Sequence, residues 1–125
     1  MEPSDFYQLI GFLYRVPAIQ QGISHGQYDD GNWWVKFQID VKNEFAWQVV
    51  QEFGHILNYV SLNERLPVVF YPVSAPPYMN GGPENFLYWI IQSKETSLSP
   101  DKVKEWLESR LPDPVDSLEE WNSED

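Results

Sequence analysis

The chain has 125 residues, a net charge of −11 and no cysteine. This length fits one domain, and hydrophobic residues make up 42% of the chain, which suffices for a core without disulfides or metal. The lack of cysteine excludes thiol catalysis and thiolate metal sites, and it suits the reducing cytoplasm, where we expect the protein to act. The negative charge repels phosphate backbones and anionic lipid, so neither nucleic acid nor a membrane is an expected partner.

The acidic residues gather at the C-terminal end. Residues 113–125 carry six of them and no base, with Pro114 and few apolar side chains. This composition predicts a single α+β domain over residues 1–112, followed by a flexible acidic tail over 113–125. Leu118 and Trp121 are the exceptions in the tail, and they can dock on the domain. The acids either favour a basic partner or only keep an aromatic-rich chain in solution.

The first elements form a helix and a hairpin. A helix is predicted over residues 5–14, capped by Ser4 and ended by Pro17, with apolar residues on more than one face. A strand over 18–28 follows, and then the turn-forming run 29–32.

The strand predicted over residues 33–41 has the clearest pattern in the chain. Apolar and polar residues alternate along it, so one face lies on the core and the other faces water. Trp33 and Trp34 are adjacent, so at least one of them leaves the core face. The alternating sets are Val35, Phe37, Ile39 and Val41 on the core side, and Lys36, Gln38 and Asp40 on the other.

The second half of the chain repeats this order of elements. Asn43 caps a helix predicted to run to residue 60, and Ser99 caps the last helix. Between them lie strands predicted over 66–73 and 86–93. The order α-β-β-α-β-β-α predicts an α+β fold, in which helices pack on a four-stranded, mostly antiparallel sheet.

Residues that could carry catalysis are few. His25 and His55 are the only histidines, and Glu52, at helical spacing before His55, gives at most half of a metal site. Asp29 and Asp30 lie in a run whose turn chemistry already explains them. No nucleotide-binding or nucleophile motif is present. We therefore expect a protein that is not an enzyme and that needs no cofactor and no metal.

The strands over 66–73 and 86–93 are apolar on both faces, unlike the strand before them. Such a strand must be covered on both faces, and one layer of helices covers only one. We expect the uncovered face to form an interface, either with a second copy of the chain or with a segment of a partner protein. Alternatively, the N-terminal helix or the tail covers it within one chain. The candidate interaction surface consists of Val69, Tyr71, Tyr78, Met79, Leu87, Trp89 and Ile91.

Tyr78 and Met79 belong to a long connection, residues 74–85, which contains three prolines and two adjacent glycines. A hairpin turn needs only about two to five residues. The extra length indicates either a binding loop or a segment that packs on its own hairpin.

The order of elements, the size and the acidity resemble the type III secretion chaperone-like fold, including its YbjN-like bacterial relatives. The resemblance covers most of residues 4–111, as architecture and hydrophobic pattern. It implies a homodimer that binds a protein segment without turnover. The long connection rich in proline and glycine departs from that fold, so no site residue is carried over. The matching parts are residues 5–14, the hairpin around 29–32, the helix 43–60, the strand 86–93 and the helix that follows Leu98.

The favoured function is thus a non-catalytic, chaperone- or adaptor-like protein-interaction domain that self-associates. One alternative is an acidic inhibitor or immunity-type protein that masks a basic partner. Another is a small-molecule-binding or enzymatic α+β domain that uses a cavity under Tyr71, Tyr78 and Trp89.

Overall fold

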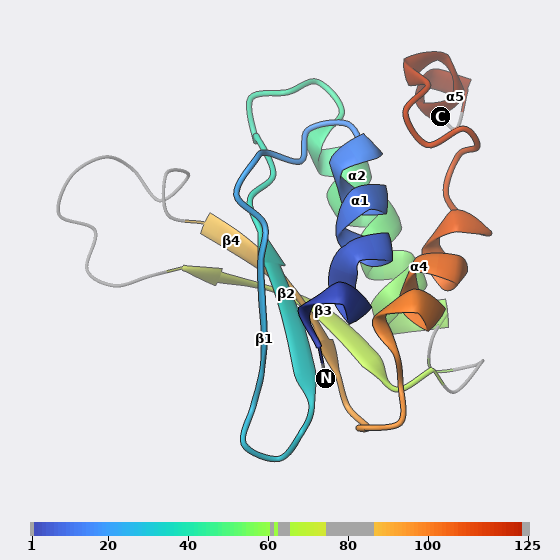
Figure 1. The fold of residues 1–125 in the computed structure, drawn as a ribbon. Helices are drawn as coiled ribbons and strands as arrows, with labels where there is room; N and C mark the ends of the chain where they lie inside the picture. The colour runs from blue at the N-terminus through green and yellow to red at the C-terminus, as the bar shows by residue number, and fades with distance from the viewer. Residues whose placement is uncertain (1, 61, 63–65, 75–86, 124–125) are drawn as a thin grey trace, which may run out of the picture.

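The structure is a computed structural model that describes residues 2–60, 62, 66–74 and 87–123 (Figure 1). It confirms the α+β prediction. Within these ranges every helix is too short or too polar to span a lipid bilayer. In chain order the elements are η1 (Pro3–Phe6, a 3-10 helix), α1 (Tyr7–Arg15), β1 (Ser24–Gln27), β2 (Trp33–Phe37), α2 (Ala46–Gly54), η2 (His55–Val60, a π-helix), β3 (Val68–Ser74), β4 (Leu87–Ser93), α4 (Pro100–Glu108) and α5 (Leu118–Ser123).

The four-stranded sheet is antiparallel throughout and has the strand order β1-β2-β4-β3. The two inner strands are therefore β2 and β4, and the two edges are β1 and β3. Figure 1 shows α1, α2 and α4 together on one side of this sheet. A single helical layer on one sheet is the architecture that the order of elements predicts.

The first hairpin confirms the alternating pattern of β2, because Val35 and Phe37 are buried while Lys36 lies outside the core. The strand before it is shorter than predicted and covers only Ser24–Gln27. Ala18 and Gly22 have positive φ angles of 74° and 93°, which interrupt an extended strand.

The helix predicted over residues 43–60 divides into α2 and η2. The prediction that Asn43 caps this helix is wrong, because α2 begins at Ala46 and its N-cap is Phe45. The side chain of Asn43 instead accepts a hydrogen bond from the backbone N–H of Phe45 at 2.8 Å, in the turn before the helix. In η2, Asn58 turns its side-chain amide toward β3. Its Nδ2 donates to the carbonyl of Phe70 at 2.6 Å, and its Oδ1 accepts from the N–H of Phe70 at 2.7 Å. The π-helix thus ties the helical layer to one edge of the sheet.

The core lies between the helical layer and the sheet face that we call the inner face. Trp33 is fully buried there, and its indole N–H donates to the carbonyl of Leu98 at 2.7 Å. Phe70 and Trp89 stack with their ring centroids 5.2 Å apart. The inner-face residues that belong to one continuous core cluster are Trp33, Val35, Phe37, Val68, Phe70, Trp89 and Ile91.

The C-terminal segment corrects the prediction of a separate tail at two positions. Val115 and Trp121 are buried in the core, and the indole N–H of Trp121 donates to the carbonyl of Val115 at 2.8 Å. Gln48 of α2 also donates to the carbonyl of Trp121, at 2.6 Å. The docking foreseen for Trp121 is therefore present, whereas Leu118 stays exposed. Trp121 docks because its side chain is large: a buried tryptophan removes about 200 Å² of surface from water, and each Å² of apolar surface contributes about 25 cal/mol to stability.

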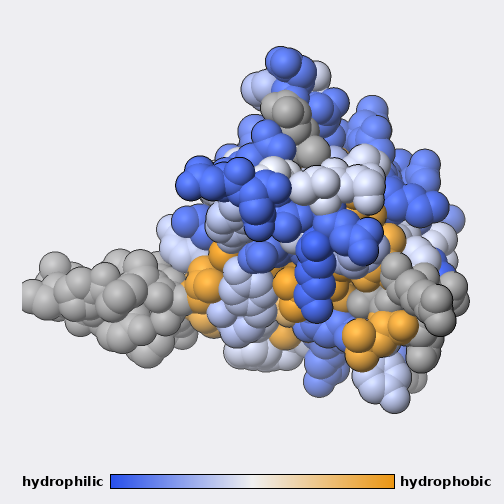
Figure 2. Space-filling model, turned by 90° about the horizontal axis from the view of Figure 1, so that it is seen from below, coloured by the Kyte–Doolittle hydropathy of each residue, from blue (hydrophilic) through white to orange (hydrophobic). Residues whose placement is uncertain are grey.

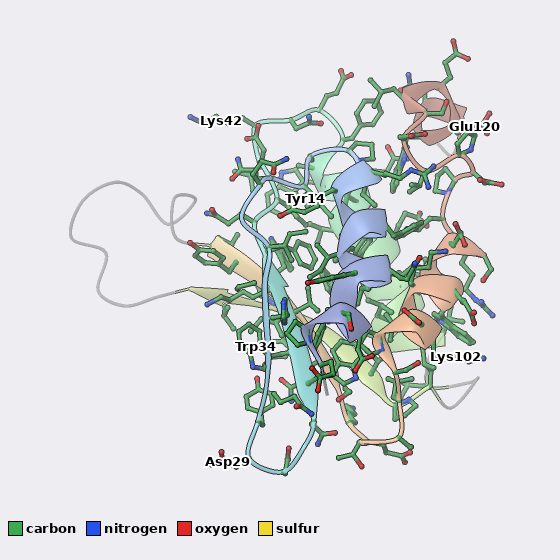
Figure 3. The ribbon with its side chains drawn as sticks, viewed as in Figure 1. Tyr14, Asp29, Trp34, Lys42, Lys102 and Glu120 are labelled. Carbon is green, nitrogen blue, oxygen red and sulfur yellow. The ribbon has the colours of Figure 1, made fainter. Side chains whose placement is uncertain are left out.

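Both terminal segments lie on the helical side of the sheet. Phe6 of η1 stacks on the ring of His25, with the centroids 4.3 Å apart, and α1 packs against α4. Figure 3 shows Trp34 on the other side of the sheet from Lys102 of α4 and Glu120 of α5. Within the part of the chain that the structure describes, neither terminal segment covers the sheet face opposite the helices.

Candidate interaction surface

The sheet face opposite the helices, which we call the outer face, is defined by the strand register. Residues paired across antiparallel strands point to the same face, and successive residues of one strand point to opposite faces. Ile90 of β4 pairs with Lys36 of β2 on one side and with Tyr71 of β3 on the other. The described strand residues of the outer face are Ser24, Gly26, Trp34, Lys36, Val69, Tyr71, Val73, Tyr88, Ile90 and Gln92.

These residues form a second apolar layer that is separate from the core. None of them belongs to the core cluster or to the side chains packed against it. Ile90, at the centre of the outer face, is 9% exposed, and the larger side chains around it are half-buried. Figure 2 shows hydrophobic side chains that reach the surface of the molecule, beside the polar residues. Aromatic and aliphatic side chains of this kind, grouped on one face, are typical of interaction surfaces.

Lys36 is the only charged residue of the outer face as defined above. Its Nζ lies 5.1 Å from the ring centroid of Tyr88 and 5.9 Å from that of Trp34, distances at which the ammonium group is attracted to both rings. The described strand residues of the outer face thus carry one positive charge and no carboxylate, although Asp30 acts on Tyr28 at the margin and the whole chain contains 19 acidic residues.

Two tyrosines fix one corner of the outer face. The hydroxyl groups of Tyr28 and Tyr71 both donate to Oε1 of Gln92, at 3.2 and 2.6 Å. The pKa of Tyr28 is raised above its ordinary value, first by partial burial, and then by the neighbouring hydroxyl of Tyr71 and the negative charge of Asp30. The three side chains therefore hold one another at the surface, and the phenol of Tyr28 keeps its proton more firmly than a free tyrosine does.

Trp34 lies flat against β1 at Gly26, its cross-strand partner. A Cβ atom at position 26 would come within 2.7 Å of Cζ2 of Trp34. Gly26 therefore allows the indole ring to rest on the backbone of β1, where a larger residue would push it away.

The structure separates the residues that the sequence placed in one candidate surface. Val69 and Tyr71 lie on the outer face. Leu87, Trp89 and Ile91 lie on the inner face, where Trp89 is 7% exposed and Ile91 is fully buried. The physical reason is the pairing of Tyr71 with Ile90, which puts odd-numbered residues of β3 on the same face as even-numbered residues of β4. The prediction of one shared outer surface is therefore wrong for these three residues of β4.

The remaining predicted positions fall outside the described residues. Tyr78 and Met79 belong to the segment 75–86, which the structure does not describe. The alternative with a cavity under Tyr71, Tyr78 and Trp89 does not fit the register, because Tyr71 and Trp89 lie on opposite faces of the sheet.

Three of the residues considered for catalysis, His25, Asp30 and His55, have structural partners. Asp30 accepts hydrogen bonds from the backbone N–H and the side-chain amide of Asn32, at 2.9 and 3.2 Å, as turn chemistry requires. His55 stacks on Tyr59, with the centroids 5.7 Å apart. Among the residues that the structure describes, no three histidine, aspartate or glutamate side chains come close enough together to hold a metal ion.

The sequence interpretation missed Trp34, Tyr88 and Ile90 as members of the surface. The alternation in β2 was sufficient to find Trp34, because Trp33 and Val35 share the core face. No local signal distinguishes Tyr88 from Leu87 or Trp89, since the whole run is apolar and only the pairing with β3 and β2 decides which residues face outward.

Comparison of the chain with known protein families, with characterised proteins and with solved structures gives no match. These comparisons therefore give no support to the predicted resemblance to the type III secretion chaperone-like fold, and what the structure shows is an α+β fold with a four-stranded antiparallel sheet.

Proposed function

We propose that this chain is a non-catalytic protein-interaction domain, chaperone- or adaptor-like, that forms a two-fold dimer through its outer face. The single observation that carries the proposal is the contrast between that face and the rest of the chain. Trp34, Tyr71 and Tyr88 surround aliphatic side chains there, and the described part of the face has no carboxylate.

Electrostatics favours this face for self-association. Two chains of net charge −11 repel each other wherever the acids are displayed, so they approach at the lowest cost through a face without them. The charge of Lys36 is held against the rings of Trp34 and Tyr88, which reduces the cost of bringing two such charges near each other.

The form of the dimer follows from the geometry of a sheet. A flat, uncovered sheet face packs on a second sheet about 10 Å away, with the side chains of both faces between them. A homodimer that holds a protein segment without turnover is also what the resemblance to the type III secretion chaperone-like fold implies. We carry this expectation over as the mode of action, with the client unspecified.

The proposal is tested by the mass of the particle in solution. Val69 and Val73 lie on the outer face of β3, and no hydrogen bond of the network around Gln92 depends on their side chains. We expect the wild-type chain to sediment as a dimer and the double variant Val69→Lys, Val73→Lys to sediment as a folded monomer. Two lysines desolvated at each half of the interface cost several kcal/mol.

The matched control is Trp47→Lys, which also replaces an apolar side chain by lysine, at a position of α2 that is 55% exposed on the helical side. This variant should dimerise as the wild type does. A wild-type chain that stays monomeric at high protein concentration contradicts the proposal, and so does a dimer that tolerates lysine at both valines.

A further inference from the structure

The two edges of the sheet differ in how many backbone groups remain free. In an edge strand every second residue directs its N–H and C=O away from the sheet, and such groups are a template on which another strand can add. β1 and β3 are the edge strands. This inference concerns the edges and goes beyond the proposed function, which uses the outer face.

The edge of β3 has no free N–H between residues 68 and 72. Asn58 engages both the N–H and the C=O of Phe70, so Phe70 directs its backbone outward, and by alternation so do Val68 and Pro72. The N–H of Val68 donates to the carbonyl of Leu66 at 2.9 Å, and proline has no N–H. This edge is closed to strand addition over these residues.

The edge of β1 lacks such protection. The N–H of Tyr28 donates to the carbonyl of Asn32 at 2.7 Å, so Tyr28 directs its backbone toward β2. By alternation Gly26 does the same, while Gln27 and His25 direct their N–H and C=O groups outward. Within the described part of the chain, no hydrogen bond engages these outward groups.

A pocket lies beside this open edge. It is lined by Pro3 and Phe6 of η1 and by His25, Gly26 and Gln27 of β1. Its lining is more apolar than polar, and Phe6, which is almost fully buried, stacks on the ring of His25 with the centroids 4.3 Å apart. A strand that adds to β1 places alternate side chains on the face where this pocket opens.

The charges around the edge indicate the kind of partner. The exposed carboxylates of Glu2 and Asp5 belong to the η1 region beside the pocket, and Asp29 and Asp30 follow directly after β1. A second copy of this acidic chain would meet its own charges here, whereas lysine or arginine residues would be attracted.

We propose that the edge of β1 is a docking site for an extended segment of a partner protein that carries an apolar side chain between basic residues. The segment adds as a strand beside His25 and Gln27 and seats its apolar side chain in the pocket against Phe6. Main-chain hydrogen bonds supply affinity, and the pocket and the flanking carboxylates supply specificity.

The test uses the full-length chain and a short blocked peptide in which valine and threonine alternate between terminal lysines. We expect the peptide to shift the backbone amide resonances of His25 and Gln27 and to slow their hydrogen exchange. A peptide with glutamate in place of the terminal lysines should bind at least about tenfold more weakly. Shifts confined to Trp34 and Tyr88 on the outer face would overturn the proposal, as would equal binding of the two peptides.

The variant Gln27→Pro closes the edge by the same means as Pro72 in β3. The N–H that it removes points away from β2, so the sheet keeps its ladder of hydrogen bonds. We expect Gln27→Pro to lose binding by about tenfold or more, and Gln27→Ala, which keeps the N–H and removes only a side chain that lines the pocket, to lose clearly less.

A second arm leaves the protein unchanged, in case Gln27→Pro does not fold. The same peptide with methylated backbone nitrogens cannot donate main-chain hydrogen bonds, so it should fail to bind the wild-type chain. Undiminished binding of the methylated peptide would exclude strand addition. Dimer mass is unaffected in every arm, which keeps this test separate from that of the outer face.

Discussion

Trp33 and Trp34 are neighbours in β2, yet they experience opposite environments. Trp33 is fully buried on the inner face, and its indole N–H donates to the carbonyl of Leu98. Trp34 lies half-buried on the outer face, over Gly26 and beside the ammonium group of Lys36. The same residue type thus fills the core on one face, while on the other it lies at the surface that we propose as the interface.

The comparison shows that composition does not distinguish the core face of the sheet from the outer face that we propose as an interaction surface. Both faces of the sheet are rich in aromatic and aliphatic side chains. The inner face is enclosed by helices, and its members form one cluster. The outer face is held in place by a few polar contacts at its margin, such as those from Tyr28 and Tyr71 to Gln92.

The largest expected effect comes from removing the buried member of the tryptophan pair. Trp33→Ala should lower the free energy of unfolding by about 3–5 kcal/mol, because it leaves a cavity and an unpaired carbonyl at Leu98. Trp34→Ala should cost roughly half of that or less, since its ring is only half-buried. Urea denaturation followed by circular dichroism measures both, below the concentration at which the chain dimerises. Equal losses would mean that the two faces are equally enclosed in the monomer.

A smaller effect separates two tryptophans of the inner face. The indole N–H of Trp89 is buried and has no hydrogen-bond partner among the described residues, unlike that of Trp33. Trp33→Phe therefore leaves a buried carbonyl without its donor and should cost about 1–3 kcal/mol more than Trp89→Phe in urea denaturation. If both variants lose the same stability, the N–H of Trp89 has a partner in solution, such as a buried water.

The faces of the sheet could be predicted only in part from the sequence. In β2 the alternation of apolar and polar residues determines which side chains are buried, and the structure confirms it for Val35 and Phe37. In β3 and β4 the apolar runs are continuous, so a shift of one residue in register exchanges the two faces without any local sign. Leu87 and Tyr88 are an example, because only the pairing determines that the tyrosine faces outward.

Contacts between distant segments were equally beyond local patterns. The acidic composition of residues 113–125 predicts a separate tail. It gives no sign of the hydrogen bond by which Gln48 of α2 holds the carbonyl of Trp121. The hydrogen bonds from Asn58 to Phe70 likewise depend on the local π-helical turn, and the sequence predicts only one continuous helix there.

The fit of Trp34 on β1 is tested by a modest substitution. Gly26→Ala places a methyl group where the indole ring now lies, so the ring must turn away from the backbone. Because the ring has room to move at the surface, we expect a loss of about 1 kcal/mol or less, together with a shift of the tryptophan fluorescence. The association of two chains should weaken more than the fold does. Unchanged dimerisation in Gly26→Ala would show that the position of Trp34 does not matter to the interface.

The smallest effect concerns the margin of the outer face at high pH. The pKa of Tyr28 is raised by partial burial, by the hydroxyl of Tyr71 and by the charge of Asp30, so the folded state prefers the neutral phenol. In the unfolded chain the phenol ionises near its ordinary pKa of about 10. The contribution of Tyr28 to stability is therefore fully present below that pH and is lost as the pH rises through the higher folded pKa. Since Tyr28 is 41% exposed, solvent weakens the effect.

We expect the urea midpoint of the wild type to fall more steeply above about pH 10 than that of Tyr28→Phe, with Tyr7→Phe on the exposed side of α1 behaving as the wild type. Parallel curves for the wild type and Tyr28→Phe would mean that the corner formed with Gln92 and Tyr71 is open to solvent. The hydrogen bonds at this margin would then not keep the outer face in place.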